Sequence, residues 1–303
     1  MDTFTHALSA SLLFIAAGHP EYLPFGILGA IVPDIDFFFK FLSDRDPKLY
    51  IFTHGGITHT FSGALGLSCV SLAVVYIFGV LGTGIEVVTV AGIFLVFCSI
   101  LSGYLFHLFL DYLAYPGIPL FYPVSDRKYT AGIFPGPSLF LMVVSTGFIV
   151  LYMTGVATFA DIWVYAAIFT GYILFRAFLK IYMAMKFPGR TIPRFNPFSW
   201  LVLDRTGSSY ELWSYVMPGK ISGKKVYEKC RGVSCTIFRE SEGLPEYRRL
   251  RYYSYFVVAE RDGDSVRLYD PLRDERIIFY PPYYSSLVIP LERGDTGSAL
   301  LAG

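Results

Sequence analysis

The first 190 residues consist of long apolar runs separated by short polar connections. A helix that crosses a membrane needs about 20 predominantly apolar residues. Four runs reach this length, at residues 61–81, 87–110, 136–157 and 162–185. Two shorter apolar runs, at residues 4–18 and 22–39, precede them and predict a helical hairpin that is partly re-entrant. The pattern therefore predicts an α-helical polytopic membrane domain of about six helices, four of them long enough to span.

After residue 190 the pattern changes to the alternation that is typical of β-strands. The alternating runs are residues 200–204, 210–216, 252–260, 265–269, 276–280 and 286–291. The polar stretch Arg261-Asp262-Gly263-Asp264 separates two of these runs and predicts a hairpin. We therefore expect a helical transmembrane domain at residues 1–190 and a small, soluble, mainly antiparallel β domain at residues 191–303. The β domain contains no histidine, so we expect it to act as a lid, a scaffold or a partner surface.

The distribution of charged residues supports this division into a membrane domain and a soluble domain. Charged residues make up 16% of the chain, against about 25% in soluble domains. Residues 1–190 hold only 9 of the 25 Lys and Arg and 10 of the 24 Asp and Glu. The formal net charge of +1 gives no reason to expect nucleic acid as a partner. Cys230 and Cys235 lie five residues apart, wider than the usual zinc-knuckle spacing, and we expect free thiols there.

Basic residues predict the orientation of the helices. They occur between residues 40 and 60, between residues 111 and 135, and after the last span, whereas the connections near 82–86 and 158–161 contain none. Cytoplasmic loops carry the excess of Lys and Arg. We therefore expect a multi-pass protein of the cell membrane with both termini in the cytoplasm.

Four histidine and aspartate motifs fall at the predicted cytoplasmic ends of these helices. Imidazole and carboxylate groups together are ligands of zinc, manganese and iron, and they are unfavourable near a bilayer unless paired, metallated or hydrated. The expected metal ligands are His6, Asp34, Asp36, His54, His59, His107 and Asp111. His19 lies at the opposite predicted face and is left out of the site. The sequence thus predicts a divalent metal, zinc before manganese or iron, at one face of the membrane.

Local spacing adds detail to this prediction. His107 and Asp111 are four residues apart on a predicted helix, so both side chains project from one face. Thr58 is expected to cap the helix that begins near His59, and Gly55-Gly56 permits a tight turn whose N–H groups could bind an anion. Counting Asp2, eight side chains could act as ligands. This exceeds the needs of one zinc ion, so we expect more than one ion, or one ion with orienting residues around it.

The motifs together resemble the YdjM-type family of membrane-bound, predicted metal-dependent hydrolases. The matching segments are Met1-Asp2-x-x-Thr5-His6, Pro33-Asp34-Ile35-Asp36, His54-Gly55-Gly56-Ile57-Thr58-His59-Thr60, His107-x-x-x-Asp111 and the segment Phe121–Tyr129. The resemblance covers residues 1–185. Gly55 and Thr60 stand where the family has Arg and Ser, so a phosphate-binding arginine is missing at position 55. More remotely, the family is similar to zinc-dependent phospholipase C and the single-strand nucleases.

This resemblance and the residues together predict a membrane-embedded metal-dependent hydrolase. A metal-activated water would attack a phosphoester at the cytoplasmic membrane face. Asp2 and Asp111 are the expected catalytic carboxylates, while Arg127, Lys128, Gly55 and Gly56 would bind the substrate. The expected partner is a membrane lipid or another amphiphilic phosphoester. Two alternatives stay open: a non-catalytic metal-binding membrane regulator, and a metal or proton transporter.

Overall fold

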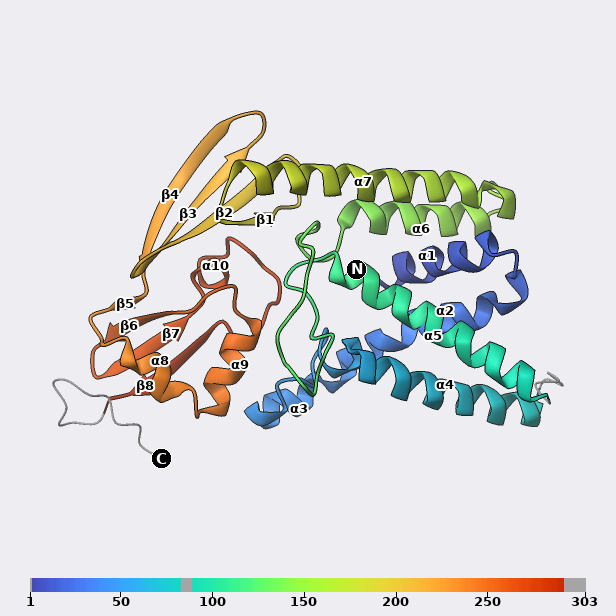
Figure 1. Ribbon diagram of the computed structural model, residues 1–303, viewed down its shortest axis with the longest axis horizontal. Coiled ribbons are helices and arrows are strands. Elements are labelled where there is room, and N and C mark those ends of the chain that lie inside the picture. The colour runs from blue at the N-terminus through green and yellow to red at the C-terminus, as the bar shows by residue number, and fades with distance from the viewer. Residues whose placement is uncertain (1, 83–88, 292–303) are drawn as a thin grey trace. The chain divides into compact units, whose positions relative to one another are not determined.

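A computed structural model describes residues 2–82 and 89–291 of the chain (Figure 1). Contacts divide it into two units. The first, called the helical unit, comprises Met1–Lys40 with Phe52–Leu179, and the second, called the β unit, comprises Phe41–Ile51 with Lys180–Gly303. This division falls at residue 180 rather than 190, and it assigns a short segment from the N-terminal part of the chain to the β unit.

The helical unit contains the expected apolar helices. In chain order these are α1 (Thr3–Ala16), α2 (Leu23–Ile31), α4 (Phe61–Gly82), α5 (Val90–Tyr112), α6 (Leu139–Met153) and α7 (Ile162–Lys186), of which α7 continues into the β unit. A 3-10 helix, η2 (Val32–Phe39), continues directly from α2, and a short one, η4 (Ile57–His59), precedes α4. Pro33 lies in the first turn of η2, where its missing N–H does no harm. Helices α1 and α2 pack against each other as the predicted hairpin, and its partly re-entrant placement in the membrane stays a prediction.

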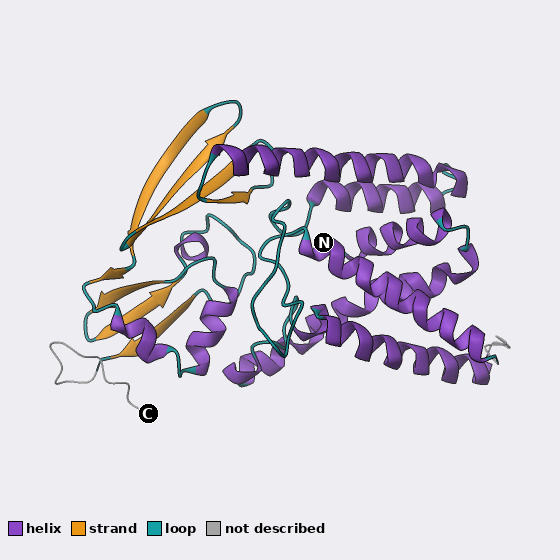
Figure 2. Cartoon of the chain, viewed as in Figure 1, coloured by secondary structure: helices purple, strands orange, loops and turns teal. Residues whose placement is uncertain are grey.

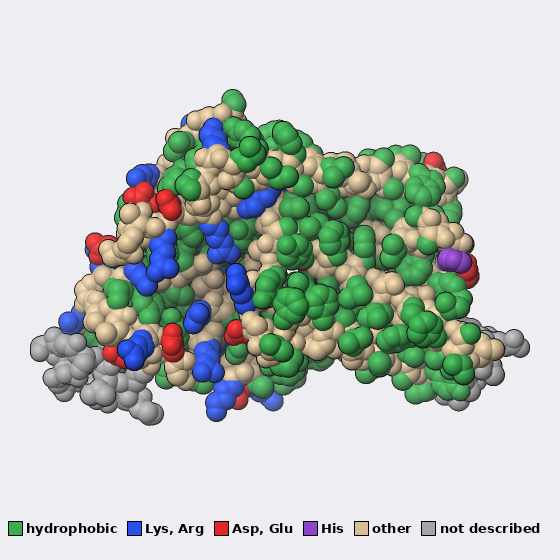
Figure 3. All heavy atoms as spheres, in the orientation of Figure 1, with side chains coloured by type: hydrophobic (Ala, Val, Ile, Leu, Met, Phe, Trp, Pro, Cys, Tyr) green, Lys and Arg blue, Asp and Glu red, His purple; other side chains and the backbone are tan. Residues whose placement is uncertain are grey.

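Three of the four predicted spans have the length of a membrane crossing. They are Phe61–Gly79, Val90–Tyr112 and Phe159–Lys186. The predicted span 136–157 is shorter than expected, because α6 has only 15 residues and rises about 22 Å. The connection predicted near 82–86 lies mostly outside the described residues. In the space-filling view, hydrophobic side chains cover the visible face of the helices, which suits contact with lipid (Figure 3).

Helices α2 and α5 approach each other closely through glycines. A Cβ added at Gly29 would lie 1.9 Å from the backbone oxygen of Ile100, and one at Gly103 would lie 2.0 Å from that of Gly26. Small residues allow such backbone approach between membrane helices, where packing replaces the hydrophobic effect as the source of association. The packing of α2 against α5 therefore requires glycine at both positions.

The β unit contains two four-stranded sheets (Figure 2). The first is antiparallel, in the order β1 (Arg190–Pro193), β2 (Ser199–Thr206), β3 (Ser209–Val216), β4 (Lys220–Glu228). The second has the order β5 (Cys230–Arg231), β6 (Val258–Asp262), β7 (Ser265–Tyr269), β8 (Ser286–Pro290), and its single parallel pair joins β5 to β6. Helices α8 (Thr236–Ser241), α9 (Pro245–Tyr253) and α10 (Pro271–Asp274) complete it, and α8 and α9 pack on the second sheet through Ile237 and Leu250. The fold class is confirmed, as is the hairpin at Arg261–Asp264.

Two strand predictions in this unit are wrong, the first in part and the second wholly, and one strand was missed. Residues 252 and 253 belong to α9, because Pro245 starts a helix whose Tyr247 and Leu250 face the core. The run 276–280 forms no strand, since Arg276 has φ of 56°, outside the extended region. Strand β4 was not predicted, because almost all of its residues are exposed and no apolar alternation marks it.

The expectation of free thiols at Cys230 and Cys235 is wrong. The two residues form a disulfide with their Cα atoms 5.5 Å apart. Gly232, at φ of 70°, turns the chain between β5 and α8 and brings the two sulfur atoms together. Cys69 and Cys98 are free.

Candidate metal centre

The four motifs converge inside the helical unit. His6 comes from α1, Asp34 and Asp36 from η2, His54 and His59 from the turn and 3-10 helix before α4, and His107 and Asp111 from the last turns of α5. His6, His59 and His107 are fully buried. His19, by contrast, is exposed and pairs with Glu21 at 3.0 Å. The structure thus brings together all seven predicted ligands.

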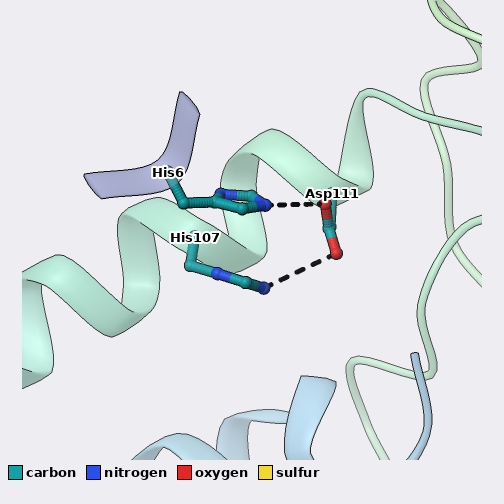
Figure 4. Close-up of side chains that lie close together, drawn as sticks. All are labelled: His6, His107 and Asp111. Atoms are coloured by element: carbon teal, nitrogen blue, oxygen red, sulfur yellow. Dashed lines mark ion pairs between the residues drawn. The ribbon is translucent and has the colours of Figure 1, made fainter. Parts of the chain in front are cut away.

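His6, His107 and Asp111 form the first group (Figure 4). The imidazole rings of His6 and His107 stack with centroids 3.7 Å apart, and both point their Nε2 atoms at the Asp111 carboxylate. The Nε2 atoms lie 3.3 Å from Asp111 Oδ1 for His6 and 3.6 Å from Oδ2 for His107. The i, i+4 spacing on α5 therefore places His107 and Asp111 on one face, as the sequence predicts.

His59 joins this group from the other side. Its Nε2 atom lies 3.1 Å from His107 Nε2 and 3.2 Å from Asp111 Oδ2. Asp34 Oδ1 lies 3.9 Å from His59 Nε2 and 3.7 Å from His107 Nε2. Five side chains, from His6, Asp34, His59, His107 and Asp111, thus direct nitrogen or oxygen atoms at one small region.

The other ring nitrogens fix the tautomers of His59 and His107. His107 Nδ1 lies 2.7 Å from the backbone oxygen of Ala30, which can only accept a hydrogen bond. His59 Nδ1 lies 3.0 Å from the Asp36 carboxylate. Each neutral ring therefore carries its hydrogen on Nδ1 and leaves a lone pair on Nε2. Two lone pairs that face each other at 3.1 Å, with carboxylates beside them, repel unless a cation lies between them.

Further atoms at the centre lack hydrogen-bond partners. Among the described residues, His6 Nε2 and Asp34 Oδ1 are buried without one. Buried polar atoms are normally satisfied, and a missing ion is one reason for an exception. Atoms bonded to one zinc ion at about 2.1 Å lie about 3.0 to 3.4 Å apart at angles of 90° to 110°. The shorter separations here agree with that range, so the residues present fit a divalent metal.

Without a metal, a proton bound to His59 would reduce the repulsion between the Nε2 lone pairs of His59 and His107. Burial alone would lower the pKa of His59, but the carboxylates of Asp36 and Asp111 raise it to about 10. Binding of a metal to His59 Nε2 would therefore release a proton.

Asp36 occupies a different place from Asp34. Its carboxylate contacts Nδ1 of His54 at 2.9 Å and Nδ1 of His59 at 3.0 Å, and it accepts hydrogen bonds from the Thr58 hydroxyl and from Gly55 N. A carboxylate on the second nitrogen of a histidine ligand holds the ring in place and increases its basicity. The geometry gives Asp36 this orienting position. Asp36, His54 and His59 also form a group that could hold a metal by itself.

The remaining predicted residues lie around these groups. Asp2 caps α1 by accepting hydrogen bonds from the N–H and hydroxyl groups of Thr5 at 2.9 and 2.7 Å. Gly55, at φ of 76°, directs its N–H at Asp36, and Gly56 O accepts from His59 N. Arg127 is exposed, with its guanidinium over the Tyr129 ring, and Lys128 is its half-buried neighbour in the same loop. Substrate binding by these residues stays a prediction.

Several residues at the centre were not predicted from the sequence. The hydroxyl of Thr3 donates to Asp34 Oδ2 at 2.8 Å, and that of Tyr104 donates to the backbone oxygen of Thr58 at 2.6 Å. Thr58 does not cap the following helix, because its hydroxyl donates to Asp36, and Thr60 Oγ1 accepts from Gly63 N instead. Thr3 occupies an unspecified position of the first motif, so its role left no signal in the sequence. Ala30 gives no signal either, since its contribution is a backbone carbonyl.

Comparison with known proteins identifies one family. The family described as YdjM inner membrane protein matches residues 1–183, which include all seven predicted ligands. No curated protein and no solved structure matches the chain.

Proposed function

The chain belongs to the YdjM inner membrane protein family, and from that premise and the site geometry we propose that it is a membrane-bound, metal-dependent hydrolase of phosphoesters. The observation that carries the proposal is the pair of facing Nε2 atoms of His59 and His107, 3.1 Å apart beside Asp111. His6, Asp34, His59, His107 and Asp111 would hold the metal. When bound, a divalent metal would supply an activated water and would stabilise negative charge on a phosphoryl oxygen.

The chain's own groups support catalysis rather than a closed structural site. The side chains of Asp34 and His54 are 15% and 28% exposed, whereas those of His6, His59 and His107 are fully buried. A hydrolytic site needs an open side, and a structural zinc site is closed. His54, in contact with Asp36 and partly open to solvent, is placed to accept or donate a proton. In this proposal Asp2 acts through α1, by capping the helix that carries His6.

The substrate class follows from where the residues lie in the chain. Asp111 lies at the end of an apolar helix long enough to span, and His59 lies just before another. A centre at this depth can reach a scissile bond at the headgroup level while the apolar part of the substrate stays among the helices. Arg127 and Lys128 would bind the anionic headgroup, since Arg and Lys bind phosphate well. A lipid or another amphiphilic phosphoester is the proposed substrate.

The test is phosphate release from defined lipid phosphoesters in mixed micelles. We expect the purified protein to release phosphate or a phosphorylated headgroup, and the Asp111→Asn variant to lose at least about 100-fold in rate, because a mispositioned metal forfeits most of its charge stabilisation. Chelation of the metal should abolish phosphate release, and subsequent addition of zinc, manganese or iron should restore this activity in the wild type but not in the variant. Equal rates for wild type and Asp111→Asn across the lipid panel would contradict the proposal.

The membrane orientation is a separate proposal. We propose a multi-pass arrangement with both termini in the cytoplasm, because the basic connections fall on one side of the predicted crossings. The Cys230–Cys235 disulfide favours the opposite side, since disulfides persist in oxidising compartments. A fluorescent protein fused to the C-terminus should fluoresce, and an alkaline phosphatase fused there should stay inactive. Active alkaline phosphatase would show that the C-terminus lies outside the cytoplasm and would contradict the proposed orientation.

A further inference from the structure

One segment of the β unit lies, in sequence, between two groups of metal-centre residues. Contacts assign Phe41–Ile51 to the β unit, although the residues on both sides of it belong to the helical unit. It carries most of α3 (Lys40–Arg45) and the 3-10 helix η3 (Pro47–Leu49). Asp36 lies five residues before it and His54 three residues after it. We call Phe41–Ile51 the linking segment.

The β unit holds the linking segment near both of its ends. Near the first end, Arg249 donates to the backbone oxygen of Ser43 at 2.6 Å, and the Tyr284 hydroxyl donates to the Asp44 carboxylate. Near the second end, the Tyr253 hydroxyl donates to the backbone oxygen of Tyr50 at 2.6 Å.

Aromatic rings reinforce these hydrogen bonds. The ring of Tyr50 contacts that of Tyr252 with centroids 5.1 Å apart, and the Arg249 guanidinium lies 4.1 Å from the centre of the Tyr284 ring. Tyr253 is 1% exposed, so its hydroxyl has little access to water as a substitute partner. The linking segment is therefore a packed part of the β unit rather than a free surface loop.

Fixing the linking segment near both of its ends makes it easier for Asp36 and His54 to meet at the metal centre. Asp36 contacts His54 and Gly55, and these contacts close the loop that contains the linking segment. Closing a flexible loop of this length is entropically unfavourable, because every free residue adds conformations that closure must exclude. A linking segment already fixed by the β unit reduces that penalty.

We propose that the β unit acts as a clamp on the linking segment and thereby positions Asp36 against His54 and His59. Arg249 and Tyr253 are positioning residues in this scheme, since they act through the chain rather than on the metal. The test by Zn²⁺ affinity rests on the proposed metal centre. The positioning of Asp36 against His54 and His59 does not depend on it. It gives the β unit the role of a scaffold for the helical unit's chemistry.

The experiment uses the full-length protein with the double change Arg249→Met and Tyr253→Phe. These substitutions remove two of the three side-chain donors to the linking segment, one near each end, and keep much of the side-chain volume. Tyr247→Phe is the matched control, because Tyr247 is also buried on α9 but packs in the core of the second sheet. We expect the double variant to bind Zn²⁺ about tenfold more weakly, at the low end of the effect of residues that orient metal ligands, and the control to bind as wild type.

A cycle with Asp36→Asn separates positioning from general destabilisation. If the clamp acts through Asp36, the double change should have no further effect on Zn²⁺ affinity in the Asp36→Asn background. Additive losses, or wild-type affinity in the double variant, would overturn the proposal.

A metal-free measurement keeps the test independent of the proposed function. The Gly55 N–H donates to Asp36 at 3.1 Å, so its hydrogen exchange reports whether that contact forms. We expect exchange of this amide to be on the order of tenfold faster in the double variant and unchanged in Tyr247→Phe. Absence of stoichiometric metal in the wild type would count against the metal centre alone, whereas unchanged Gly55 exchange in the double variant would overturn the clamp.

Discussion

The protein in which His59→Ala and His107→Ala are combined is expected to bind divalent metal far more weakly than the wild type. The two Nε2 atoms face each other at 3.1 Å and both lie within 3.6 Å of Asp111, so the double change removes two of five converging ligand atoms. Because altering even an orienting residue costs about 10- to 100-fold in metal affinity, loss of two ligands should lower affinity by more than about 100-fold. Elemental analysis of protein purified under mild conditions measures this directly.

His19→Ala is the matched control for this prediction. His19 is the same residue type in the same unit, but it is exposed and pairs with Glu21 rather than with the centre. We expect it to retain wild-type metal content. Stoichiometric metal in the double variant, or none in the wild type, would contradict the assignment of the centre.

Gly29→Ala is expected to destabilise the helical unit strongly. Its Cβ would lie 1.9 Å from the backbone oxygen of Ile100, and backbone atoms of a packed helix cannot move aside as a flexible side chain can. We expect a loss of about 3 kcal/mol, the upper end of the range for overpacked sites. The change should also weaken metal binding, because α2 carries the Ala30 carbonyl that accepts from His107. Thermal unfolding in detergent, followed by size-exclusion chromatography, measures the first effect.

Gly66→Ala provides the comparison for Gly29→Ala. Gly66 is also in an apolar helix, but a Cβ there would meet nothing within 4 Å. We expect its stability to stay the same or to rise by up to about 1 kcal/mol, because Ala is favoured over Gly inside a helix and the added Cβ meets no neighbour. Equal unfolding temperatures for the two variants would show that α2 and α5 are not in close backbone contact.

Much of the candidate centre could be predicted because its chemistry is carried by rare residue types in an apolar background. Histidine and aspartate are unfavourable near a bilayer without partners, so His6, His107 and Asp111 were informative from sequence alone. Helical periodicity then placed His107 and Asp111 on one face of α5.

The different positions of Asp34 and Asp36 could not be predicted. They are two residues apart in one motif, yet Asp34 faces the Nε2 atoms of His59 and His107 while Asp36 faces the Nδ1 atoms of His54 and His59. Residues two apart on a helix point in widely different directions, and the 3-10 geometry of η2 fixed which way each points. The spacing alone is compatible with either carboxylate as a ligand.

The β unit was less predictable than the helical unit for a related reason. Strand β4 carries almost no burial pattern, and it forms because β3 offers a partner for its backbone. The helix α9 overlaps a run that also alternates, and Pro245 together with the packing of Leu250 decided its conformation. Propensity is a weak guide where tertiary contacts supply the stabilisation.

By itself the sequence determined the apolar helices, the change to a β-rich part and the hairpin at Arg261–Asp264, because each of these depends on residues close together in the chain. It also determined the histidine and aspartate set, because those residue types stand out in an apolar background. Only the tertiary structure decided which nitrogen of each histidine faces the centre, that a carbonyl at Ala30 and hydroxyls at Thr3 and Thr58 support it, and that residues 41–51 pack with the β unit. These features depend on contacts between distant segments. Backbone carbonyls and common hydroxyls leave no mark in a sequence that would reveal such contacts.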